Sequence, residues 1–267
     1  MDKLSKRQAE FIKNHRRHHY LVSFFRFMAF FSFLLLWEVS ANLHWIDAFI
    51  FSSPSRILET MIYMAKDYSI FRHTGITLYE TLLSFFLVIL VSFLTATILW
   101  FSGTISEILE PWLVILNSLP KSALAPLLIV WLGANTRTII VAGMSVAVFG
   151  SIISMYTAFR ETDEEKIKLI HTLGGNQLQV LFHVVIPSSL PSIISILKVN
   201  IGLCLVGVII GEFLAAREGL GYLIIYASQI FKLNYLITAL IILCIIAFLL
   251  YQIIQNIEHH IRKNRNL

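Results

Sequence analysis

Three long apolar runs of this chain contain no charged residue, and they constrain its fold more than any short motif does. The runs cover residues 81–106, 138–159 and 233–257, and are 26, 22 and 25 residues long. A helix needs about 20 apolar residues to cross the hydrocarbon core of a bilayer. Each run is therefore long enough to span a membrane as one helix.

The composition of the whole chain agrees with a membrane protein. Hydrophobic residues make up 57% of the 267 residues, charged residues only 14%, and the mean hydropathy is +0.76. A soluble domain carries roughly 25% charged residues. Three weaker apolar runs, at 21–43, 122–133 and 190–214, complete the pattern. We predict an all-α integral membrane protein with six transmembrane helices.

The distribution of Lys and Arg predicts which side each loop faces. Six spans place both ends of the chain on one side, and cytoplasmic segments carry an excess of Lys and Arg. With both ends and the loop after the fourth span inside, the inner face holds 13 of these residues and the outer face six, with Lys121 and Lys198 unassigned. We expect both termini to be cytoplasmic in a bacterial or archaeal plasma membrane. The net charge of +5 therefore reports orientation and not nucleic-acid binding.

These assignments divide the chain into consecutive parts. A basic cytoplasmic tail is expected at 1–20, the first transmembrane helix at 21–43, and a core at 55–258 that includes a cytoplasmic loop at 160–187. A second cytoplasmic tail is expected at 259–267.

Motifs for catalysis are missing from the sequence. There is no Gly-x-x-x-x-Gly-Lys phosphate loop, no His-Glu-x-x-His zinc motif and no Gly-x-Ser-x-Gly nucleophile elbow. The chain alone is thus not expected to hydrolyse ATP, and we assign it no catalytic residue, metal site or cofactor.

Two connecting segments carry interpretable patterns. After the first span, Ser53 or Ser55 can cap a short amphipathic helix that lies at the membrane surface, and of its possible roles we favour a simple lid that covers the bundle. Between the second and third spans, Pro111, Pro120 and Pro126 lie close together, which predicts a broken or kinked helix. A broken helix is tolerated where it faces protein or a water-filled path, so this one either lines such a path or packs ordinarily.

The loop after the fourth span begins with helix signals. Thr162 and Glu165 have the spacing of a capping box, in which each side chain bonds the other residue's backbone N–H. Ile167, Ile170 and Leu173 then recur at helical spacing on one face. We predict a short amphipathic helix here.

A second helix follows a glycine turn. Gly174 and Gly175 end the first helix where left-handed dihedral angles cost little, and Asn176 can cap the next one. Pro187, with Pro191 beyond it, is expected to stop this helix before the fifth span. Its expected apolar face consists of Leu178, Leu181, Phe182 and Val185. Because loops seldom exceed about 12 to 15 residues without a function, residues 160–187 are predicted to offer a surface to a partner.

The same loop resembles a known family, the six-span permease subunits of binding-protein-dependent ABC importers, in particular the nitrate, sulfonate and taurine branch. Residues 173–176 (Leu-Gly-Gly-Asn) and 184–191 (Val-Val-Ile-Pro-Ser-Ser-Leu-Pro) match its cytoplasmic coupling loop with the expected spacing. The family's Glu-Ala-Ala triplet is replaced by Lys-Leu-Ile at 168–170, and Glu165 lies one turn earlier.

Further stretches resemble the same branch in the same order. One departure is Glu80, where the branch usually has Arg. The matching stretches are Trp37–Glu38, Ser53–Ser55, Pro126–Gly133, Gly211–Ala215 and Gly219–Ile224.

The resemblance implies a mechanism and a set of partners. Two permease copies, expected as a homodimer in membrane lipid, would combine with two ATP-binding subunits and an extracytoplasmic solute-binding protein. ATP and Mg would be held by the ATPase, whose closure would act on the coupling loop. The residues implied in this coupling are Glu165, Gly174, Gly175, Asn176, Gln177, Leu178, Leu181, Phe182 and Pro187.

Polar residues within the apolar runs are candidates for the translocation path, because each costs about 2.5 to 3.5 kcal/mol when uncompensated at the bilayer centre. They are Glu38, Lys198, Asn200 and Glu212. Lys198 either pairs with an acidic side chain such as Glu38 or Glu212, which we favour, or attracts an anion.

Two other classes of membrane protein compete with this interpretation. A secondary transporter would work without an ATPase, and its halves would show internal repeats. A membrane enzyme would need a catalytic or metal constellation at membrane depth. Neighbouring genes for an ATPase and a secreted binding protein would favour the importer. The solute itself stays open among sulfonate, taurine, nitrate and vitamin-precursor classes.

Overall fold

The structure is a computed structural model that describes residues 6–265, with side chains described for 18 and for 20–261. The described residues form helices and turns and contain no strand. The chain separates into two compact units, residues 1–63 and residues 64–267, which we describe one at a time.

The first unit contains a long helix and a capped amphipathic one. Helix α1 covers Lys6–Asn42, α2 Ala48–Phe51 and α3 Pro54–Lys66, whose last three residues belong to the second unit. The Ser53 hydroxyl accepts a hydrogen bond from the Arg56 N–H at 3.4 Å, which confirms Ser53 as the cap. Ser55 instead contacts Glu38, whose carboxylate accepts its N–H at 3.0 Å and its hydroxyl at 2.8 Å.

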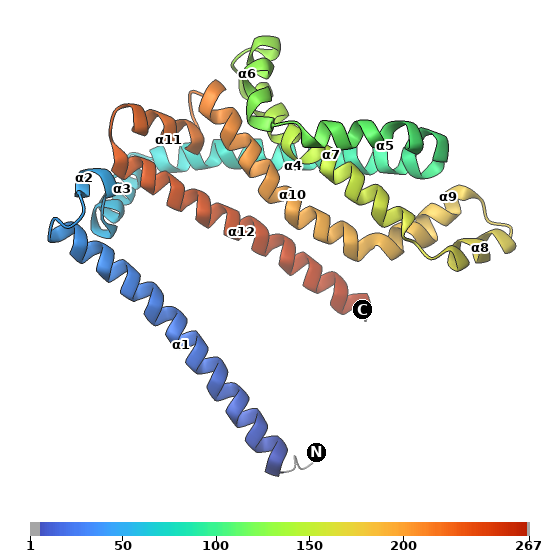
Figure 1. Cartoon of the computed structure of the whole chain (residues 1–267), viewed down its shortest axis with the longest axis horizontal. Helices are drawn as coiled ribbons and strands as arrows, with labels where there is room; N and C mark the ends of the chain where they lie inside the picture. Colours follow the sequence, from blue (N-terminus) through green and yellow to red (C-terminus); the bar gives the residue numbers. More distant parts are fainter. Residues whose placement is uncertain (1–5, 266–267) are drawn as a thin grey trace. The chain divides into compact units, whose positions relative to one another are not determined.

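The second unit holds the remaining helices (Figure 1). They are α4 (Ser69–Phe101), α5 (Gly103–Ser118), α6 (Lys121–Leu132), α7 (Thr136–Arg160), α8 (Glu164–Thr172), α9 (Gln177–Val180), the π-helical turn η1 (Leu181–Val185), α10 (Ile186–Ala215), α11 (Leu220–Gln229) and α12 (Leu233–Arg265). Helix α12 therefore continues through most of the segment expected as a C-terminal tail.

Five helices among the described residues are long and apolar enough to cross a membrane, and one bent pair can supply a sixth span. The pair is α5 with α6, which meet at 96°. The break falls at Leu119 and Pro120, where a proline disfavours helical backbone in the residue before it. The predicted six spans and the predicted broken helix are thus confirmed. The third span is longer than predicted, because it includes α5.

The expected start of the second span was wrong. Glu80 was taken as its charged boundary, but α4 begins at Ser69, so Glu80 lies inside the helix and is only 1% exposed. A single buried carboxyl does not end a helix when a neighbouring element supplies a hydrogen-bond partner.

Helix α7 is the centre of the second unit and packs along both α4 and α10. Glycines allow the close approach: a Cβ added at Gly207 of α10 would lie 2.8 Å from the Cα of Gly143 on α7. A Cβ at Gly143 would in turn lie 2.7 Å from the Ser84 hydroxyl of α4. Helices in lipid associate through such close packing, because burial of apolar surface gives little driving force there.

We predict that Gly207→Ala destabilises the protein and that Gly202→Ala does not. The added methyl group at Gly207 must displace backbone of α7, a cost of about 1 to 3 kcal/mol for overpacking. Gly202 is on the same helix, and a Cβ there meets nothing within 4 Å. Thermal unfolding of the two variants in detergent, followed by size-exclusion chromatography, measures the difference. Equal midpoints for both variants would contradict the close contact.

Candidate functional site

Helix α8 starts with a different cap from the one expected. The Asp163 carboxylate accepts the Glu165 N–H at 2.9 Å, so Asp163 is the N-cap and the predicted capping box between Thr162 and Glu165 is wrong. Thr162 is 7% exposed, and its hydroxyl has no hydrogen-bond partner among the described residues. Packing at the end of α7 buries Thr162, which leaves the next residue to cap the helix.

The apolar positions of α8 separate into two groups. Ile167 and Ile170 pack against a buried cluster, whereas Leu173 is 76% exposed and Leu169 58% exposed. The expected common face of Ile167, Ile170 and Leu173 is therefore wrong for Leu173, which lies at the C-cap, where the helix ends.

Two glycines make the turn after α8. Gly174 has φ of +84°, in the region that favours glycine, and the Gly175 N–H donates to the Ile170 carbonyl at 2.9 Å. A Cβ at Gly175 would lie 2.4 Å from a side-chain carbon of Ile170. Both glycines are thus required by the backbone, as predicted for the end of this helix.

Asn176 caps the second helix through a reciprocal pair of hydrogen bonds. Its carboxamide oxygen accepts the Gln179 N–H at 2.9 Å, and the Gln179 carboxamide accepts the Asn176 N–H at 2.8 Å. This is a capping box, and it confirms the predicted cap. The turn and the first residues of α9 are therefore fixed locally.

The second helix does not stop at Pro187 as predicted. It passes through the π-helical turn η1 into α10, and Pro187 and Pro191 both lie within that helix. A proline in an α-helix lacks an N–H and its ring crowds the carbonyl four residues earlier. In η1 the Ile186 N–H donates to the Leu181 carbonyl, five residues earlier, and this wider turn accommodates the proline. Residues 177–215 form one continuous helical span.

One side of α9 and η1 is built into the protein core. Val180, Leu181 and Val185 are at most 2% exposed and form a cluster with Met155 and Phe159 of α7. The predicted single apolar face therefore divides, because Leu181 and Val185 are buried while Leu178 and Phe182 are not.

Four large apolar side chains of the segment are instead exposed. We call them the exposed apolar face, and each is more than half exposed: Leu169, Leu173, Leu178 and Phe182. Figure 1 shows α8 and α9 together at one end of α7 and α10. The described residues of the second unit leave each of these side chains more than half uncovered, which makes a surface suited to a partner.

The predicted path residues take separate positions. Lys198 forms an ion pair with Glu258 of α12, so its acidic partner is neither Glu38 nor Glu212 as we expected. Asn200 donates to the Ser151 hydroxyl of α7 at 2.7 Å. Each is a compensated polar group between packed helices.

Glu212 serves the end of α10. Its carboxylate accepts the Thr77 hydroxyl of α4 at 2.7 Å and the Gly221 N–H of α11 at 2.5 Å. Glu38 belongs to the first unit, where it bonds Ser55. The four candidates thus have four different sets of partners.

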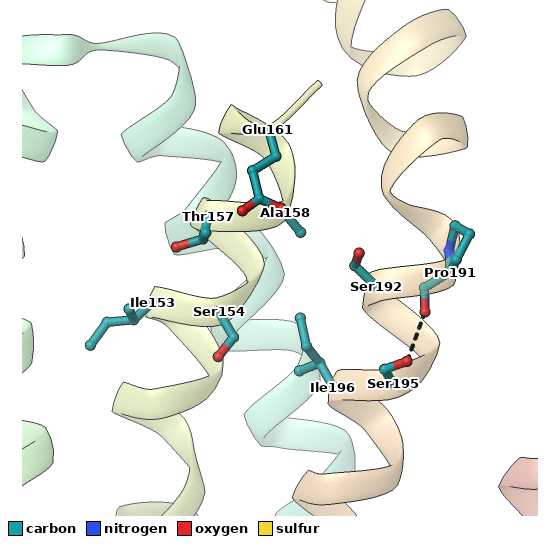
Figure 2. A pocket seen from close by; sticks show the side chains of 9 residues that line it. All are labelled: Ile153, Ser154, Thr157, Ala158, Glu161, Pro191, Ser192, Ser195 and Ile196. Carbon is teal, nitrogen blue, oxygen red and sulfur yellow. Dashed lines mark hydrogen bonds between the residues drawn. The ribbon is translucent and has the colours of Figure 1, made fainter. Parts of the chain in front are cut away.

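A groove with several hydroxyl groups, which the sequence did not predict, lies next to the loop 160–187. It is formed by the last turns of α7 and the first turns of α10. Its volume is about 490 Å³. Figure 2 shows Ser154 on α7 and Ser192 on α10 at opposite walls, with Ile196 between them. Ser195 donates to the Pro191 carbonyl at 3.1 Å. The hydroxyl positions fall at helical spacing, but Ser and Thr are too common in transmembrane helices for that spacing alone to identify them.

Comparison with known proteins identifies relatives over most of the chain. Residues 88–263 match the family model described as "Binding-protein-dependent transport system inner membrane component". A probable ABC transporter permease protein of Haemophilus influenzae is 32% identical over 85% of this chain and 91% of its own length. The taurine transport system permease protein TauC of Escherichia coli is 25% identical over 81% of each chain. The formylaminopyrimidine transport permease protein ThiX of Halalkalibacterium halodurans is 26% identical over 72% and 76%.

Solved structures agree in fold. An inward-facing MetNI methionine ABC transporter chain superposes with a TM-score of 0.65, covers 72% of this chain and 96% of its own length, and is 18% identical. The helical arrangement of the second unit is therefore that of type I ABC importer permeases.

Asn176→Ala should loosen the start of α9. Loss of the cap costs about 1 kcal/mol, which corresponds to roughly fivefold faster amide exchange at Gln179 and Val180. Gln177→Ala, one position away at an exposed site, is the matched control and should leave exchange unchanged. Hydrogen exchange followed by mass spectrometry measures both, and equal rates in the two variants would rule out the capping box.

Exchanging the charges of Lys198 and Glu258 should restore stability that either single change removes. Their side chains are 18% and 11% exposed, so the single variants Lys198→Glu and Glu258→Lys should cost between the ~1 kcal/mol of a surface pair and the ~4 kcal/mol of a buried one. The measurement is a double-mutant cycle, which compares the denaturation midpoints of the wild type, the two single variants and the double variant. Additive losses in the double variant would show that the pair does not stabilise the fold.

Proposed function

Because the chain belongs to the binding-protein-dependent transport system inner membrane components, we propose that it receives the force of ATP binding through residues 160–187 and uses it to open a path for a small solute. The family assignment rests on the matched residues 88–263. The coupling proposal rests mainly on the exposed apolar face, which lies on a segment that is otherwise fixed by caps and buried side chains.

The connections of the segment support its use as a lever. Helix α8 follows α7 after three residues, and α9 continues through η1 into α10. The buried cluster around Val180 and Leu181 joins the segment to α7 and, through Ala96, to α4. A partner that displaces the exposed apolar face would therefore move the ends of the two central helices together.

The partner proposed for this face is a separate ATP-binding subunit, which would hold ATP and Mg. Four large apolar side chains exposed at the cytoplasmic end of a membrane protein favour a protein partner over solvent. Glu165, Asn176 and Gln177 are exposed nearby and would form the polar rim of the contact.

The complete importer would contain a second permease copy, two ATPase subunits and an extracytoplasmic solute-binding protein. The excess of Lys and Arg on the predicted inner face supports cytoplasmic termini and a cytoplasmic position for residues 160–187. The solute would be a small organic molecule or oxyanion, since similar permeases are named for taurine and for formylaminopyrimidine.

The groove between α7 and α10 supports an inner section of the path. The hydroxyls of Ser154, Thr157 and Ser192 line it and have no hydrogen-bond partner among the described residues. Polar groups at membrane depth face a protein interior or a water-filled cavity. A second permease copy over this groove would enclose such a cavity.

Leu178→Asp and Phe182→Asp should each abolish retention of the ATPase. A buried aspartate without a partner opposes an apolar contact, and hot-spot positions typically contribute 2 kcal/mol or more, about a thirtyfold loss of affinity. The measurement is co-purification from detergent of the tagged chain with a co-expressed candidate ATP-binding subunit.

Tyr68→Asp is the matched control, since it places the same charge on a side chain that is 74% exposed in the turn before α4. It should leave retention and membrane insertion unchanged. If all three variants retain the ATPase equally, the segment is only a connector. If the wild type retains none, a transporter that works without an ATPase becomes the better explanation.

A further inference from the structure

Two buried carboxyl groups meet where α4 contacts the end of α10. Glu80 and Glu212 are each 1% exposed, and their side chains are within hydrogen-bond reach of each other. Two carboxylates in contact inside a protein cannot both be ionised, because their repulsion in a low dielectric is too large. The pair therefore holds one proton.

The hydrogen bonds around Glu212 identify which group carries that proton. The Glu212 oxygens accept the Thr77 hydroxyl and the backbone N–H groups of Gly221 and Tyr222. The Thr77 hydroxyl donates to Glu212 at 2.7 Å, and its oxygen accepts the Leu220 N–H at 2.9 Å. Glu212 is thus an ionised acceptor, and Glu80 is the neutral acid that donates to it.

The second oxygen of Glu80 has no donor. Glu80 Oε2 is buried and makes no hydrogen bond with any described residue. Glu80 also lines a pocket of about 370 Å³ between α4, the start of α7 and the end of α10. The other lining residues include one with an amide side chain, Asn135, and two with charged side chains, Arg217 and Glu218. A buried carboxyl oxygen without a donor, in a residue that lines a cavity, favours a donor from whatever fills the cavity.

In the part of the chain that the structure describes, no Lys, Arg or His side chain forms an ion pair with Glu80 or Glu212. On α4, Arg72 pairs with Glu218, and the His73 ring accepts the Gly219 N–H at 3.0 Å through Nδ1. Arg217 lies at the pocket and is exposed. The buried part of the pocket wall therefore presents the carboxyl pair and the unpartnered Glu80 oxygen, whereas the cation Arg217 lies at the exposed part.

We propose that this pocket is a binding site for an N–H donor group, an ammonium or an aromatic amino group, carried by the transported solute. The proposed topology places the loops 133–136 and 216–219 on the outer face, where a solute would enter, so this assignment to a solute rests on the proposed function. A sulfonate or nitrate has no donor for Glu80 and would approach the negative pair unfavourably. The solute class is thus a neutral or cationic amine-bearing molecule.

The test uses a cysteine in the pocket wall and small charged thiol reagents as probes. Ala216→Cys places a thiol in the pocket, in a Cys244→Ser background, since Cys244 is exposed and Cys204 is buried. The full chain in lipid nanodiscs is treated with the 2-aminoethyl, 2-(trimethylammonium)ethyl and 2-sulfonatoethyl methanethiosulfonates. Each rate is divided by the rate of the same reagent with free cysteine.

We expect the aminoethyl reagent, which has N–H donors, to react fastest and the sulfonate slowest, about tenfold apart for one net charge nearby. Glu80→Gln should preserve this order, because an amide also donates to Glu212 and keeps an acceptor for the pocket. Glu80→Leu should remove the advantage of aminoethyl over trimethylammonium but keep the advantage of cations over the sulfonate. The Leu variant also corrects for the difference in reagent size.

Three results would overturn the proposal. The first is a ratio of the aminoethyl reaction rate to the trimethylammonium reaction rate that is the same in wild type and Glu80→Leu. It would mean that the free acceptor binds only water. A cation preference that falls in Glu80→Gln would mean that Glu80 is ionised. A sulfonate preference would reverse the solute class. None of these measurements involves the ATPase, so each leaves the importer assignment standing.

Discussion

The close contact of α7 with α10 is the constraint on which the second unit depends. Gly143 and Gly207 allow the two helix backbones to approach until no Cβ fits between them, and α4 packs on the same helix. Because lipid offers little hydrophobic drive for helix association, this contact and the hydrogen bonds beside it hold the central helices together. The groove, the pocket and the loop 160–187 all lie toward the ends of this helix pair.

Polar groups mark both ends of the pair for different reasons. At one end, the Ser189 hydroxyl of α10 donates to the Ala158 carbonyl of α7, and the helices then separate around the hydroxyl-lined groove. At the other end, Glu212 ties α10 to Thr77 and Gly221. The Glu212 hydrogen bonds hold α10 at the second end. A force applied at the Ser189 end would therefore change the angle between α7 and α10 and would not slide one helix along the other.

Local sequence signals predicted local structure well. The turn at Gly174, the cap at Asn176 and the broken helix at Pro120 follow from backbone preferences of single residues, and the structure has all three. The apolar runs likewise predicted the spans, because a helix needs about 20 consecutive apolar residues to cross a bilayer.

The predictions that were wrong concern features that depend on packing between residues far apart in the sequence. Thr162 and Asp163 are both good caps, and burial at the end of α7 selects the second. Lys198 pairs with Glu258, 60 residues away, and no local pattern distinguishes that carboxylate from others. The burial of both Glu80 and Glu212 where α4 meets the end of α10 likewise depends on the fold.

The π-helical turn before Pro187 fixes the rotational phase between α9 and the membrane-spanning part of α10. It accommodates one residue more than an α-helical turn would, and one residue corresponds to about 100° around a helix axis. Removing that residue would keep the helix continuous but turn Leu178 and Phe182 away from their present direction. The direction in which Leu178 and Phe182 point therefore depends on the number of residues in the turn Leu181–Val185, and not on which side chains those residues carry.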